Sequence, residues 1–130
     1  MKHKFVEYMP TKLEDNTLYI SIEYDIAKHK CACGCGDEIV TTLSPARWQL
    51  IYDGETVSLT PSIGNWNHDC NSHYFIKKDK VIWAGDFSKK QIENVINNDK
   101  EVLEKHIQKH KKHGFVKTFI ERIKNLFRNN

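Results

Sequence analysis

The segment His29–Gly36 reads His-Lys-Cys-Ala-Cys-Gly-Cys-Gly, and the fold of this chain depends on it. Three of the four cysteines lie there at alternate positions: Cys31, Cys33 and Cys35. The fourth, Cys70, is followed by a second histidine, His73. Zinc in proteins takes four donors in a tetrahedron, and cysteine and histidine are its usual ligands. We therefore predict a zinc site to which these two segments contribute.

The simplest complete ligand set takes two donors from each segment. It consists of Cys33, Cys35, Cys70 and His73, with Cys31 and His29 as additional donors. Gly34 would let the backbone curl so that its neighbouring thiolates reach one ion. The alternative is a group of buried free thiols, which are common core residues.

A zinc ion here has either a structural or a catalytic role. Four protein ligands close a structural site, whereas a catalytic site keeps one position for water. Several thiolates would weaken the Lewis acidity that activates water, so the donor types favour a structural ion. Glu23, six residues before His29, argues for catalysis, because a carboxylate beside zinc-bound water acts as a general base. Taken alone, however, Glu23 is better explained as an exposed strand residue.

Composition describes an ordinary globular chain. Its 130 residues are 39% hydrophobic and 28% charged, which fits one domain with an appendage. We find neither an apolar run of about 20 residues, as a membrane span needs, nor the apolar core of a secretory signal. We expect a cytoplasmic protein, where thiols stay reduced and clustered cysteines more often bind metal.

Charge divides the chain into two parts. Residues 1–99 carry 11 Lys/Arg and 14 Asp/Glu, a net charge of −3, whereas residues 100–130 carry 9 and 3, a net charge of +6. A basic tail can contact nucleic acid, a membrane or an acidic partner. Nucleic acid is the weakest of these interpretations, because basic and aromatic residues are not interleaved on a predicted sheet.

The expected fold is α+β. Residues 1–87 form a small, mostly antiparallel β domain built around the zinc site, and residues 88–130 form two or three C-terminal helices. Strands are expected at 4–8, 17–24, 38–43, 47–52, 55–59, 73–77 and 80–84. Asp53-Gly54 indicates a tight hairpin turn.

The helical region begins at a capping signal. Ser88 and Gln91 have capping-box spacing. Asn97-Asn98-Asp99 is expected to break the first helix, and Gly114 to end the second. Residues 115–128 form a basic amphipathic last helix with apolar residues on one face. That face packs on the β domain, or docks onto a partner or a membrane surface.

Four motifs in order along residues 4–86 carry a resemblance to a known family. They are Ser21–Tyr24, His29–Gly36, Ser58–Trp66 and Cys70–Tyr74. With them the chain resembles a small bacterial and phage family, although Phe75 stands where the family usually has tryptophan. Members are found in operons that encode ubiquitin-like proteins with activating and conjugating enzymes. The resemblance implies a deconjugating or processing peptidase.

This implied function is a zinc-dependent peptidase or isopeptidase acting on a ubiquitin-like modifier. Glu23 would be the general base, and His29, His73 and one of the cysteines would hold the ion. The expected partners are a ubiquitin-like protein or its conjugates, with the activating and conjugating enzymes as further candidates. The alternative function is a non-catalytic adaptor held together by a structural zinc, which docks a protein partner or membrane through its C-terminal helix.

Ser72-His73 invites comparison with a serine nucleophile and its base. Adjacent strand residues point to opposite faces, so the two side chains would not pair. We assign Ser72 to the second ligand shell of the zinc site instead, where it would orient a ligand.

Overall fold

The computed structural model describes residues 1–85 and 88–128, except for the side chains of residues 115, 119, 123 and 125–128. The chain divides into two compact units, Met1–Ile92 and Glu93–Asn130, and each is described by itself. The division into domains at 1–87 and 88–130 stays a prediction.

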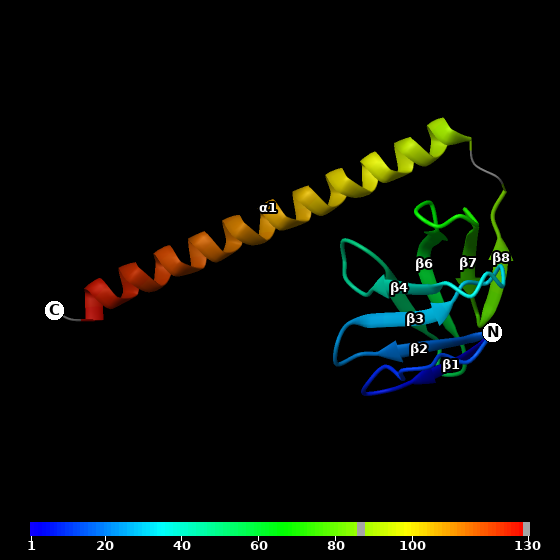
Figure 1. Ribbon diagram of the computed structural model, residues 1–130. Coiled ribbons are helices and arrows are strands. Elements are labelled where there is room, and N and C mark those ends of the chain that lie inside the picture. Colours follow the sequence, from blue (N-terminus) through cyan, green and yellow to red (C-terminus); the bar gives the residue numbers. More distant parts are fainter. Residues whose placement is uncertain (86–87, 129–130) are drawn as a thin grey trace. The chain divides into compact units, whose positions relative to one another are not determined.

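The first unit contains two four-stranded sheets (Figure 1). The first sheet has the order β1 (Lys2–Phe5), β2 (Thr17–Ser21), β3 (Ile26–Lys30) and β4 (Glu38–Thr42). β1 pairs with β2 in parallel, and the other pairs are antiparallel. The strand expected at 17–24 ends at Ser21, because the chain turns there into β3, a strand that the sequence analysis did not predict.

The second sheet is fully antiparallel. Its order is β5 (Gln49–Tyr52), β6 (Val57–Gly64), β7 (His73–Lys77) and β8 (Lys80–Trp83). The predicted hairpin at Asp53-Gly54 is confirmed as the β5–β6 connection. The Asp53 carboxylate accepts hydrogen bonds from the N–H groups of Glu55 and Thr56, which closes the turn.

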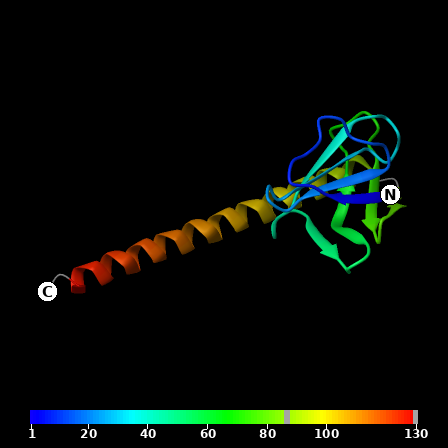
Figure 2. The ribbon, with the colours of Figure 1, turned by 90° about the horizontal axis from the view of Figure 1, so that it is seen from below.

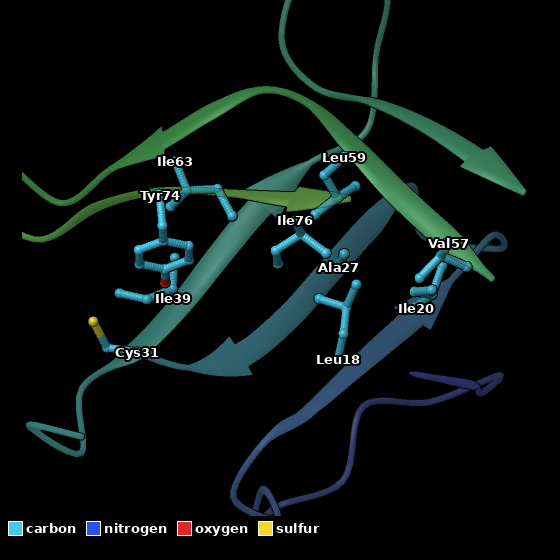
Figure 3. Close-up of a cluster of buried hydrophobic side chains, with 10 residues drawn as sticks. All are labelled: Leu18, Ile20, Ala27, Cys31, Ile39, Val57, Leu59, Ile63, Tyr74 and Ile76. Atoms are coloured by element: carbon cyan, nitrogen blue, oxygen red, sulfur yellow. The ribbon is translucent and has the colours of Figure 1, made fainter. Parts of the chain in front are cut away.

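The core lies where the two sheets face each other, and both contribute to it (Figure 3). Its buried residues are Leu18, Ile20, Ala27, Cys31, Ile39, Val57, Leu59, Ile63, Tyr74 and Ile76. Alternate residues of β4 and β7 supply this face, as a half-buried antiparallel strand requires. The expected α+β fold with a mostly antiparallel β domain is therefore confirmed.

A β-bulge interrupts the pairing of β6 with β7. Leu59 pairs with Ile76 and Ile63 with Tyr74, and the register shifts between these pairs. Pro61 lies inside the shifted segment, where its missing N–H costs no ladder hydrogen bond. Bulges redirect side chains, and this one contains Ser62.

The C-terminal region differs from the expectation of two or three helices. One helix, α1 (Lys89–Arg128), runs through Asn97-Asn98-Asp99 and through Gly114 (Figure 2). Those residues lower helix propensity by only about 0.5–1 kcal/mol each, and the Lys, Glu, Gln and Leu residues around them compensate. The predicted cap is confirmed, since the Gln91 N–H donates to Ser88 Oγ and the Ser88 N–H to Gln91 Oε1.

The apolar face predicted for residues 115–128 lies largely outside the described side chains. Val116 and Ile120, which are described, are exposed. Among the described residues, no helix has the length and apolar character needed to cross a membrane.

Candidate functional site

All four cysteines gather at one end of the β unit. The Sγ atoms of Cys31, Cys33, Cys35 and Cys70 all lie within 4.8 Å of one another. Cys31 Sγ is 3.3 Å from Cys33 Sγ and 3.9 Å from Cys70 Sγ. Four thiolates around a tetrahedral zinc ion, with Zn–S bonds near 2.3 Å, would stand about 3.8 Å apart. The cluster therefore fits a metal ion such as zinc, with Cys31 as a full member.

The backbone of the loop between β3 and β4 creates this cluster. Cys31 directly follows β3, and the Gly34 N–H donates to the Cys31 carbonyl at 3.1 Å. Gly34 and Gly36 have φ angles of +87° and +90°, which favour glycine. Cys70 arrives on the loop between β6 and β7.

The thiols influence one another's ionisation. Burial raises the pKa of Cys31, but hydrogen bonds from Ser72 and from the backbone and side chain of Cys33 outweigh it and lower the pKa to about 7. A backbone hydrogen bond at Asp37 lowers the pKa of Cys35, but the nearby Cys33 side chain contributes to a net rise to about 12. A bound cation would relieve the repulsion that opposes ionisation of the whole group.

Neither predicted histidine belongs to the cluster of four. His29 is fully buried, and its Nε2 lies 2.8 Å from the Tyr74 hydroxyl. Burial lowers the pKa of His29 to about 4, so the imidazole is neutral. His73 contacts Ser62 instead.

Glu23 lies at the wrong end of β3. It is exposed in the turn between β2 and β3, whereas Cys31 follows the far end of the strand. Five strand residues at about 3.3 Å each separate them by roughly 16 Å. The structure therefore does not bring Glu23 to the cysteine cluster.

A serine and a histidine meet on the outer face of the second sheet. Ser62 Oγ, in the bulge of β6, lies 2.9 Å from Nε2 of His73, the first residue of β7. A neutral imidazole can accept the serine proton over this distance, as in enzymes that transfer an acyl group through a serine.

Two aromatic rings lie beside His73. The Trp66 ring centre is 5.0 Å from that of His73, and the Phe75 ring centre is 6.2 Å away. Burial lowers the pKa of His73, and a backbone hydrogen bond with Gly85 partly offsets this effect. A Cβ atom on Gly64 would collide with the Trp66 indole, so this ring position needs a glycine beneath it.

Ser72 lies among the thiols. Its Oγ is 3.0 Å from Cys31 Sγ and 3.4 Å from Cys70 Sγ. It also accepts a hydrogen bond of 2.8 Å from the Asn65 amide. Ser72 is thus in contact with two of the candidate metal ligands.

A cleft of about 520 Å³ connects the two groups of residues. Its lining includes Cys33, Cys70, His73, Trp66, Trp83 and Gly85. A molecule bound there would contact the histidine on one side and the cysteine loop on the other.

Ser62 and Asn65 are functional candidates that the sequence analysis missed. Both belong to Ser58–Trp66, a segment that carried the family resemblance. Membership of this segment was the only sequence signal for either residue. The pairing of Ser62 with His73, however, depends on a bulge that no sequence pattern marked.

A comparison with protein families supplies independent information. Residues 5–84 match the model of a family described as "Bacterial ubiquitination-like system serine protease (BubE)". Comparisons with curated proteins and with solved structures found no match. The prediction of a zinc-dependent peptidase with Glu23 as general base is therefore wrong, because the family is described as a serine protease. The link to ubiquitin-like conjugation is supported by the same description.

Proposed function

Because the chain belongs to the BubE family of serine proteases from bacterial ubiquitination-like systems, we propose that it is a protease with Ser62 as nucleophile and His73 as general base. The observation that carries this proposal is the distance of 2.9 Å between Ser62 Oγ and His73 Nε2. A serine nucleophile and its general base need this contact before the reaction begins.

The reaction follows from this geometry. Ser62 Oγ attacks the scissile carbonyl carbon while His73 Nε2 takes the hydroxyl proton. The protonated imidazole then gives the proton to the departing amine, and an acyl ester remains on Ser62. Water, deprotonated by the same imidazole, hydrolyses the ester. The backbone hydrogen bond at Gly85 would orient His73, a task that a carboxylate performs in many serine proteases.

The proposed substrate is the extended C-terminal tail of a ubiquitin-like protein, free or in a conjugate. The system named in the family description supports this class of partner. The cleft beside His73 offers room for a peptide chain. Among the described strands, β8 pairs only with β7, so its other edge is open to an added strand.

We infer that the four thiolates hold a structural zinc ion. Cys31, Cys33, Cys35 and Cys70 supply four ligands, which is a complete tetrahedral set without a position for water. Bound zinc would join the β3–β4 loop to the loop before β7 and so support the cleft wall. Such a site needs reduced thiols, which suits the cytoplasm.

Labelling with a fluorophosphonate, a reagent for activated serines, tests the proposal. Mass spectrometry should find the adduct on Ser62. Ser62→Ala should abolish labelling, and His73→Ala should slow it by about 10⁴-fold or more. Ser58→Ala, on the same strand but away from His73, is the matched control and should label normally. An adduct on Ser72, or full labelling of Ser62→Ala, would contradict the assignment.

A further inference from the structure

We propose that Asn65 is a positioning residue for catalysis, which holds the segments of Ser62 and His73 in the register that lets them meet. This inference rests on the proposed function. Asn65 is buried, with 5% of its surface exposed, and follows β6 directly.

The backbone of Asn65 forms the first connection. Its N–H donates to the Ser72 carbonyl at 2.9 Å. The neighbouring residues Gly64 and His73 are ladder partners in the β6–β7 pair. The hydrogen bond therefore extends the pairing by one residue beyond the end of β6, after a bulge that has disturbed the register.

The side-chain amide forms the second connection. Nδ2 donates to Ser72 Oγ at 2.8 Å and lies 3.5 Å from the Tyr74 hydroxyl. Ser72 and Tyr74 are the two neighbours of His73 in the chain. The amide thus contacts both flanks of the histidine from the core side, while the imidazole projects from the opposite face.

The same amide reaches the cysteine cluster. Asn65 Nδ2 is 3.4 Å from Cys31 Sγ, which in turn is 3.0 Å from Ser72 Oγ. Figure 3 places Cys31 and Tyr74 at the same end of the core. Asn65 therefore links the end of the serine strand, the histidine strand and the thiols.

The chemistry of this position requires an amide. The acceptors around Nδ2 are a hydroxyl, a phenol and a sulfur, and one NH₂ group has two hydrogens to share among them. A carboxylate of the same size has no hydrogen to donate and would place a charge beside the thiols. Alanine removes the donor altogether.

The test measures the rate of fluorophosphonate labelling at Ser62 in the full chain. Asn65→Ala and Asn65→Asp should label about 10–100-fold more slowly, since displacement of about 1 Å at a reacting group has effects of this size. The rate is expressed per folded molecule, measured by tryptophan fluorescence, so a partly unfolded variant still gives a result. Asn67→Ala, an exposed asparagine two residues away, is the control and should keep the wild-type rate.

A double-mutant cycle with Ser72→Ala tests the connection itself. If Asn65 acts through Ser72, the double variant should label no more slowly than the slower single variant. The inference would be overturned if the rate losses of the two single variants multiplied in the double variant. Wild-type labelling rates in both Asn65 variants would also overturn it. If the wild-type chain shows no labelling at Ser62, the proposed function fails first, so the two failures are distinguishable.

Discussion

His73 titrates in surroundings that favour its neutral form. Burial lowers the pKa of His73 below the ordinary histidine value of about 6.5. Only the neutral imidazole can take the Ser62 proton, so the labelling rate should fall as the pH drops through the lowered pKa. We expect a plateau at neutral pH and an inflection below pH 6.5. An inflection at or above that value in a pH series of labelling rates would argue against His73 as the base.

Gly64 leaves space for the ring that contacts His73. In Gly64→Ala the new methyl group would displace the Trp66 indole and, through it, the imidazole. We expect Ser62 labelling to slow by about tenfold or more, with the fold retained. Gly114→Ala, where a Cβ meets nothing within 4 Å, is the matched control. Equal labelling rates in the two variants would show that the ring position does not matter.

The cysteines and Ser62 differ in how far their roles could be predicted from the sequence. Cys33, Cys35 and Cys70 were predicted to lie together because few roles other than metal binding explain clustered thiols in a reducing compartment. Cys31 is not part of the simplest predicted ligand set, because the sequence does not reveal the backbone turn that brings its thiol close to the other three. The sequence does not single out Ser62, because serine is a common residue and only the contact with His73 on the neighbouring strand suggests a role for it.

The helix α1 contains an internal glycine, a residue with low helix propensity. Gly114 is exposed and open on all sides, so alanine would fit without rearrangement. We expect Gly114→Ala to stabilise the helix by about 1 kcal/mol. Thermal melting followed by far-ultraviolet circular dichroism measures this change. A loss of helical signal would contradict this expectation and would show that the helix requires a glycine at position 114.

Most elements followed from local patterns. The Asp53-Gly54 hairpin and the cap at Ser88 depend on neighbouring residues only, and both were predicted correctly. The sequence does not predict β3, because the polar run Lys28-His29-Lys30 shows no apolar alternation. The alternation becomes visible only when His29 is known to be buried. The single helix was missed because propensity breaks of about 0.5–1 kcal/mol are too small to end it.

The two units of the chain should respond differently to metal removal. All three tryptophans lie in Met1–Ile92, so tryptophan fluorescence reports that unit alone. A strong chelator should lower its melting temperature by about 10 °C or more, because a saturating ligand contributes about 2.7 kcal/mol at 100 times its dissociation constant. The helical circular dichroism signal should persist.

The control for this experiment is the same chelator saturated with zinc, which should leave the transition unchanged. An unchanged transition with free chelator would show that no bound metal stabilises this unit.

The bulge in β6 should also affect how readily the backbone around Ser62 opens locally. β6 and β7 both have neighbouring strands on two sides, but the bulge interrupts the β6–β7 ladder between Leu59 and Ile63, and β5 pairs with β6 only as far as Thr60. Amide hydrogens in doubly paired strands exchange with solvent mainly through global opening, and those in interrupted segments exchange through local fluctuations. We therefore expect the backbone amides around Ser62 to exchange with solvent faster than those of β7. In the proposed protease, Ser62 would then be the partner that adjusts its position to a substrate carbonyl, and His73 would keep its position on β7.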